Sequence, residues 1–261
     1  MPSVDLICLA NSHKHSYRCV AGLRLDGGGW VRPVSTREHG ELQYNQYRLP
    51  DHSEPHIFDV IRVGLSHHLA LPHQPENWLV DGTPWQLLER PASADKARVI
   101  AASVSREPRL FGDTNRATPQ ARFRYRAARE SLVLVQPSKI RWRTEFNTYQ
   151  LRNMPRVLFE LADVSYDLPL TDPAYAGPLQ RRDEGEYRSA DLGIPEDAPI
   201  LFTISLGEPF DGICYKLVAA VVVITPGIAG LTRQPVVVTS NRERVPEHGG
   251  LSTSGNPYLG P

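Results

Sequence analysis

Short apolar stretches recur along the chain, each ended by Gly, Pro or polar residues, and this pattern predicts strands rather than long helices. Residues 4–10 (VDLICLA) predict a buried strand, and residues 17–25 predict a second. The glycines of 26–29 (DGGG) suit a tight hairpin turn, which leads to a third strand at 29–35. Residues 57–64 predict a fourth strand. Such a meander of short strands is what a small barrel requires.

A second strand-rich region begins near Ser131. Its predicted strands are 139–143, a hairpin with arms at 156–161 and 165–171, and two late strands at 200–205 and 215–224. Residues 86–103 between the two regions predict a helix, with Pro91 near a turn or near the helix start because proline is excluded from helix interiors.

Several segments, in this order and spacing, resemble the bacterial dual OB-containing domain family. They are CLANSHKHSYRCVAG (8–22), GWVRPVS (29–35), GEL (40–42), QPENW (74–78), YDLPLTDP (166–173) and CYKLVAAV (214–221). The resemblance covers roughly residues 4–224. It implies two tandem OB folds and a role in nucleic-acid transactions, including prokaryotic defence or modification systems.

The expected fold class is therefore mainly β, with two tandem OB-like barrels and a few short helices. We expect residues 1–110 to form the first barrel with a following loop and helix, residues 111–230 to form the second barrel, and residues 231–261 to form a largely irregular tail.

Composition narrows the classes of partner. The formal net charge is zero, so a polyanion site must come from local clustering of cations. The longest apolar run, 217–224, is far shorter than the roughly 20 residues of a membrane-spanning helix. Three cysteines without CxxC spacing indicate a reducing compartment. We expect a soluble, cytoplasmic protein with no membrane partner.

The chain has no P-loop, GxGxxG or GxSxG motif and no zinc-like histidine spacing, so we expect neither cofactor nor metal.

Two short segments combine cations with aromatic residues, as nucleic-acid-binding strands do. The candidate phosphate and base contacts are Arg122, Arg124, Tyr125, Arg126, Arg141, Trp142 and Arg143. A strand at 122–126 gathers three guanidinium groups on one face, but it then places the aromatic rings on the opposite face. Residues 121–130 can alternatively be helical, and an ordinary solvated strand face gives the same pattern.

A second polar set falls on the N-terminal strands, the loop at 11–16 and the loop after the fourth strand. Its members are Asn11, Ser12, Lys14, Arg18, Arg32, Ser35, Glu76 and Asn77. Because strand side chains alternate, Trp30 shares one face with Arg32, and it is a further candidate platform for base stacking. If they converge at one barrel mouth, they form a nucleotide or nucleic-acid pocket in which Glu76 is the candidate catalytic acid or base. Turn capping and structural ion pairs are the alternative.

Lys216 lies in an apolar run and needs a partner, since burying an unpaired ammonium is costly. Asp172 is one candidate partner, and a bound ligand is another. Three functions stay open: a protein that binds single-stranded or modified DNA or RNA, an enzyme acting on a nucleotide or modified base, and a scaffold with protein partners.

Overall fold

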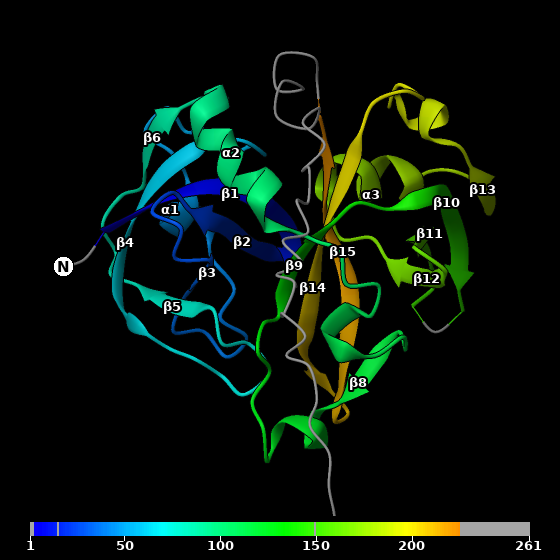
Figure 1. Ribbon diagram of the computed structural model, residues 1–261, viewed down its shortest axis with the longest axis horizontal. Helices are drawn as coiled ribbons and strands as arrows, with labels where there is room; N and C mark the ends of the chain where they lie inside the picture. Colours follow the sequence, from blue (N-terminus) through cyan, green and yellow to red (C-terminus); the bar gives the residue numbers. More distant parts are fainter. Residues whose placement is uncertain (1–2, 15, 149, 225–261) are drawn as a thin grey trace, which may run out of the picture.

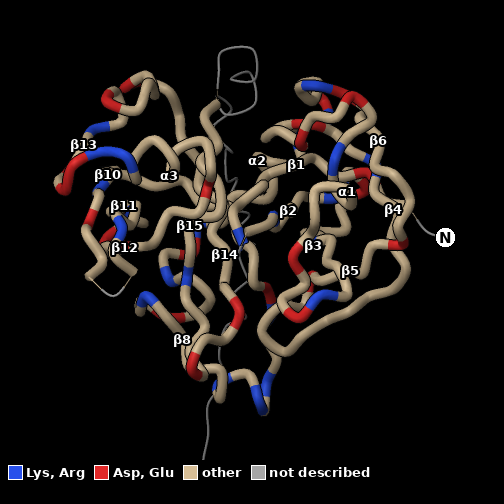
Figure 2. Tube along the Cα trace, turned by 180° about the vertical axis from the view of Figure 1, so that it is seen from behind, with Lys and Arg blue, Asp and Glu red and all other residues tan. Residues whose placement is uncertain are grey.

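The computed structural model describes residues 3–14, 16–148 and 150–224, in which two strand-rich lobes lie side by side (Figure 1). The tail expected at 231–261 lies outside the described residues. Figure 2 shows Lys and Arg interspersed with Asp and Glu along both lobes, in keeping with the zero net charge. In the described part of the chain, no helix is long and apolar enough to cross a membrane.

Five strands close the first barrel. They are β1 (Ser3–Lys14), β2 (Tyr17–Arg24), β3 (Trp30–Val34), β4 (Val60–His68) and β5 (Asn77–Val80). The ring runs β1-β2-β3-β5-β4 and returns to β1, with β3 and β5 parallel and the other neighbours antiparallel. β6 (Gln86–Glu89) pairs antiparallel with β4, and α1 (Tyr44–Tyr47) lies between β3 and β4 in the sequence. A five-stranded Greek-key ring of this kind is the OB fold.

The predicted N-terminal hairpin is confirmed, with one correction to its length. Gly27 and Gly29 have φ of 80° and 82°, the left-handed conformation that glycine adopts without a Cβ clash. The expected polar loop at 11–16 begins later, because β1 extends to Lys14 and pairs with β2 over that stretch. Asn11, Ser12 and Lys14 are therefore strand residues.

The second lobe repeats the same strand order. Its strands are β9 (Leu132–Val135), β10 (Ser138–Asn147), β11 (Arg152–Leu161), β12 (Val164–Pro169), β14 (Ile200–Phe210) and β15 (Ile213–Val223). β9 and β10 act as one interrupted first strand, since β9 pairs with β14 and β10 with β11. A single parallel bridge, Leu170 to Val218, joins the end of β12 to β15 and completes the ring. The predicted hairpin and the two late strands are confirmed.

Smaller elements fill in the second lobe. α3 (Pro173–Gln180) follows β12, β13 (Gly185–Tyr187) pairs with β10, and η3 (Ser189–Leu192) precedes β14. α3 begins at Pro173, where a proline is tolerated because its missing N–H would have no partner in the helix. The Asp172 side chain caps this helix by accepting a hydrogen bond from the Ala174 amide.

A shared apolar core joins the two barrels. Leu6 and Cys8 of β1 point into the first barrel, while Ile7 and Leu9 pack against Leu201 and other residues of the second lobe. Alternate side chains thus enter different cores, which is why VDLICLA is apolar at nearly every position. The lobes are also joined by hydrogen bonds, including the one that the Thr203 hydroxyl donates to the Leu9 carbonyl at 2.6 Å.

The segment between the barrels corrects the helix predicted at 86–103. Residues 86–89 form β6, and the helix α2 (Ala94–Ser103) begins only after Pro91. α2 packs into the shared core through Ala97 and Ile100. The chain then wraps the second lobe through β7 (Val104–Ser105), η1 (Leu110–Gly112), β8 (Ala117–Pro119) and η2 (Gln120–Phe123).

Candidate nucleic-acid interface

The segment 120–130 does not form a strand: it begins with the 3-10 helix η2 and continues in turns and bends, so the helical alternative holds only for its first residues. η2 ends at Phe123, which is buried against Leu206 and Cys214, and the chain continues in bends. Arg122, Arg124 and Arg126 are exposed, and Tyr125 is 92% exposed. A strand would place the cations and the aromatic rings on opposite faces. This segment is not a strand, so that separation does not apply to it.

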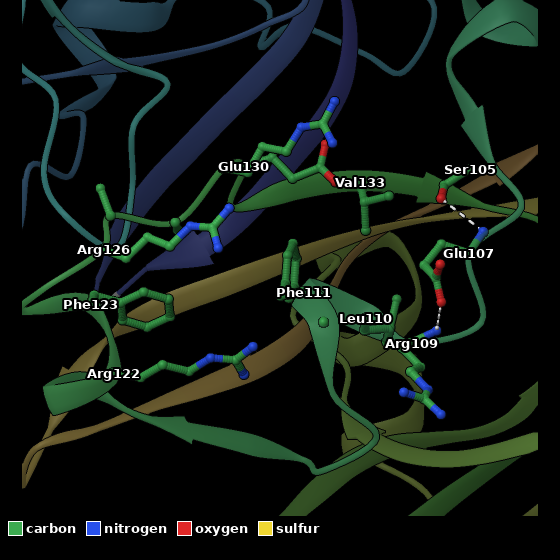
Figure 3. Close-up of a pocket in the computed structure, with 14 residues that line it drawn as sticks. Ser105, Glu107, Arg109, Leu110, Phe111, Arg122, Phe123, Arg126, Glu130 and Val133 are labelled. Atoms are coloured by element: carbon green, nitrogen blue, oxygen red, sulfur yellow. Dashed lines mark hydrogen bonds between the residues drawn. The ribbon is translucent and has the colours of Figure 1, made fainter. Parts of the chain in front are cut away.

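A pocket of about 390 Å³ lies beside this segment, and we call it the arginine pocket. Its lining includes Arg109, Phe111, Arg122, Phe123 and Arg126, together with Glu107 and Glu130 (Figure 3). Arg122 and Arg126 extend from one wall toward Phe111, and residues 105–109 form the opposite wall (Figure 3). Arg122 is held by Asp113 at 2.5 Å. Among the described residues, Arg109 and Arg126 have no acidic partner within ion-pair distance.

A second pocket, of about 410 Å³, lies on the first barrel, and we call it the tryptophan pocket. Trp30 at the start of β3 and Trp78 of β5 line it together with Arg24 and His68. The His68 and Trp78 rings lie 4.8 Å apart. The Arg24 guanidinium is bound to Asp26 in the adjacent turn. This pocket combines accessible aromatic surface with a cation.

Arg129 and Glu130 line both pockets, so the two pockets adjoin each other at these residues. Burial among these residues and the negative charge of Glu76 raise the pKa of Glu130, while Arg129 acts in the opposite direction. Arg129 has no ion-pair partner among the residues that the structure describes. The junction therefore carries a guanidinium without an ion pair and, beside it, a carboxyl group whose pKa is raised.

A sequence model of the dual OB-containing domain matches residues 4–221, which is most of the chain. The chain belongs to the dual OB-containing domain family. This match agrees with the two OB-like rings seen in the structure. The chain has no significant match among curated proteins.

The structure of this dual OB chain divides the predicted polar set into separate groups. Asn11 and Arg18 both bind the carboxylate of Glu54, and Lys14 binds Glu208 of the second barrel at 2.8 Å. The Ser12 hydroxyl donates to the backbone carbonyl of Cys19. These are structural contacts, of the kind that the alternative interpretation named.

Arg32 and Glu76 are brought together, but at the barrel boundary rather than at an open mouth. Arg32 is only 1% exposed, and its guanidinium donates to Asn77, Ser131 and Ser205 at 3.1 Å each. Glu76 accepts from the Ser131 hydroxyl at 2.6 Å and from two backbone amides. The expectation that Arg32 contacts a ligand at an open barrel mouth is therefore wrong, because the barrels bury it between them. Asn77 is likewise buried.

The second cationic segment, residues 141–143, is partly occupied by contacts within the protein. Trp142 is fully buried and donates its indole N–H to Ser189, so it cannot be the stacking platform that we expected. Arg143 binds Asp167 at 2.6 Å. Arg141 is exposed and has no ion-pair partner among the described residues, so its guanidinium, unlike that of Arg143, is available to a ligand.

The partner of Lys216 is Asp113, not Asp172. Lys216 is fully buried, and its ammonium lies 2.6 Å from a carboxylate oxygen of Asp113. Asp172 instead accepts from the amides of Ala174 and Val221. Asp113 also binds Arg122, so Lys216 supports the arginine pocket from behind.

Sequence reasoning missed several residues that line the two pockets. They are Arg24, His68, Trp78, Arg109, Phe111, Arg129 and Glu130. Arg129 follows Arg126 by three positions, so a wider reading of the cationic run would have included it. Trp78 ends the QPENW segment that carried the family resemblance. In the described part of the chain, no three His, Cys, Asp or Glu side chains gather as metal ligands would.

Proposed function

We propose that this dual OB protein binds a single strand of nucleic acid along the surface formed by the tryptophan and arginine pockets. The observation that carries the proposal is that Arg129 and Glu130 line both pockets, which makes one path from paired aromatic rings to clustered guanidinium groups. Unpaired bases stack on aromatic side chains while arginines hold the phosphates.

The position of the tryptophan pocket supports this function. OB folds bind oligonucleotides on the face of their second and third strands and on the loop between the fourth and fifth. Arg24 ends β2, Trp30 begins β3, and Pro75 and Glu76 lie in the loop before β5. The pocket therefore occupies the usual binding face of the first barrel.

The cations of this surface are available to phosphates. Arg109 and Arg126 have no acidic partners among the described residues, and Arg129 is within electrostatic range of Glu130 without forming an ion pair with it. Arg143 and Arg156 of the second barrel, in contrast, are bound to Asp167. Local availability of arginine offsets the zero net charge of the whole chain, because counterion release depends on the cations that touch phosphates.

Binding is favoured over the enzymatic alternative by the environment of Glu76. A general base needs a free lone pair directed at a substrate. Both carboxylate oxygens of Glu76 already accept hydrogen bonds from Ser131 or Leu132. These contacts give Glu76 a role in fixing the barrel boundary.

The test measures binding of short single-stranded DNA and RNA by fluorescence anisotropy across a salt series. We expect retention at low salt, and the double variant Arg126→Ala/Arg129→Ala should reduce the log–log salt slope by about 1.4, which is 0.7 for each lost phosphate contact. Arg98→Ala is the matched control, since Arg98 is an exposed α2 residue that pairs with Asp95 at the surface and lines neither pocket. The proposal fails if no strand binds at low salt, or if the double variant has the same slope as Arg98→Ala.

A further inference from the structure

We infer that the arginine pocket receives a terminal phosphomonoester, so that the protein recognises a phosphorylated end of the strand. This inference rests on the proposed function and names the group that the arginine pocket binds. A terminal phosphate carries more negative charge than an internal one and has more unesterified oxygens. The strand also ends at this phosphate, so a closed pocket with one entrance can hold it.

The guanidinium groups of the arginine pocket come from both of its walls. Arg122 and Arg126 extend from the η2 side, and Arg109 comes from the segment that forms the opposite wall (Figure 3). Asp113 holds the Arg122 guanidinium in place and is itself held by Lys216. The pocket thus has one preorganised cation and two that are free to close on a ligand.

The charge of the pocket matches a dianion. Arg109, Arg122, Arg126 and Lys216 supply four positive charges in and behind the pocket, while Asp113 and Glu107 supply two negative ones. At the junction, Arg129 stands beside Glu130 and offsets its remaining charge. The excess of two positive charges suits a phosphomonoester, which carries about −1.5 to −2 at neutral pH, better than a diester with a single charge.

The shape of the pocket is consistent with an end group. A strand that enters from the tryptophan pocket passes Arg129 and Glu130 and then faces the wall of residues 105–109. Phe111 lies between the cationic walls and offers a ring to the sugar or base that carries the phosphate (Figure 3). The last nucleotide therefore places its phosphate among the arginines while earlier bases occupy the tryptophan pocket.

Glu130 does not oppose this arrangement. Partial desolvation and the charge of Glu76 raise its pKa, so the carboxyl stays neutral to a higher pH than a fully solvated glutamate does. Once the carboxyl is ionised, the positive charge of Arg129 beside it offsets its charge, and the net charge of the pocket stays positive.

The test compares three oligonucleotides of one sequence, with a 5′-phosphate, a 3′-phosphate or hydroxyls at both ends, and a free nucleoside monophosphate as a fourth probe. We expect one phosphorylated strand to bind about tenfold tighter than the hydroxyl strand, which corresponds to one net charge-assisted hydrogen bond. Arg126→Gln should abolish that preference while the hydroxyl strand still binds, and Arg98→Ala should keep it.

The outcomes separate the inference from the function on which it rests. Equal affinity for all three strands overturns the end-recognition site and leaves strand binding intact. Binding of the nucleoside monophosphate without any strand, lost in Arg126→Gln, overturns strand binding but supports the phosphomonoester site as one for a free nucleotide. Failure of every probe overturns both.

Discussion

The ammonium of Lys216 lies 2.6 Å from a carboxylate oxygen of Asp113, and the lysine is fully buried. Asp113 also accepts from Arg122 and Thr118, so one carboxylate joins the interior of the second barrel to the wall of the arginine pocket. Burial alone would raise the pKa of Asp113, but the hydrogen bond and charge of Lys216, with hydrogen bonds from Thr118 and the Asn115 amide, lower it overall. Asp113 therefore both neutralises the buried lysine of the second barrel and fixes the position of Arg122 in the arginine pocket.

We predict that Asp113→Asn destabilises the protein by about 3–5 kcal/mol, because the substitution leaves a buried ammonium without a counterion. Lys216→Met should cost less, since an apolar side chain of similar length fills the same space without a charge. Urea unfolding of both variants measures the difference. A loss below about 1 kcal/mol for Asp113→Asn, the range of exposed ion pairs, would contradict a structural role for the pair.

We predict that Glu76→Gln weakens the boundary between the barrels. The carboxylate accepts from the Ser131 hydroxyl and from the amides of Ser131 and Leu132, whereas a glutamine offers one acceptor and turns an N–H toward those donors. The expected loss is about 2 kcal/mol of unfolding free energy. Glu196→Gln, at an exposed position with no described partner, is the matched control. Equal unfolding midpoints for the two variants would rule out this role for Glu76.

Tryptophan fluorescence should report on the binding surface. Trp85 and Trp142 are at most 1% exposed, whereas Trp30 and Trp78 line the tryptophan pocket. Stacking of bases should therefore quench only the signal of Trp30 and Trp78. In a titration with a single strand, Trp30→Phe and Trp78→Phe should each reduce the amplitude of quenching, and Trp85→Phe should not. Undiminished quenching in both pocket variants would place the strand elsewhere.

Strand binding should depend on the protonation of Glu130. Its pKa is raised, so the carboxyl is neutral at low pH and becomes an anion as the pH rises through that value. An anion at the junction repels the diester backbone, so affinity for an unphosphorylated strand should fall as the pH rises from the ordinary glutamate value of 4.5 toward neutrality. Glu130→Gln should flatten this part of the profile. The idea is wrong if both proteins show the same pH dependence.

Much of the fold follows from local patterns in the sequence. The turn at 26–29 needs glycine at two left-handed positions, and two apolar runs separated by Gly, Pro and Asp residues predict the 200–223 hairpin. The extent of β1 was harder to predict because its residues 11–14 are polar. They are held in the strand by pairing with β2 and by a backbone bond from His13 to Thr171, which the local sequence does not reveal.

The site residues were predicted less well because their partners are distant in the chain. The alternation correctly put Trp30 and Arg32 on one face, but that face meets Ser131 and Ser205 of the other barrel, and Arg32 is buried as a result. Asp172 was a reasonable partner for Lys216 by type, yet the helix start at Pro173 engages it instead. Patterns within a strand predict its faces, but they do not reveal which tertiary partner covers each face.

The apolar core shared by the barrels has a consequence for how the protein is made. Ile7 and Leu9 emerge early in synthesis, while Leu201 and Ala219, which cover them, follow roughly 190 residues later. At about 5–20 residues per second, that interval is about 10–40 s. During this time the strands of the first barrel can pair and close the ring, but the apolar surface that Leu201 and Ala219 later cover stays exposed on the ribosome. A truncated chain that ends before β14 keeps this side exposed permanently, so it should self-associate where the whole protein does not.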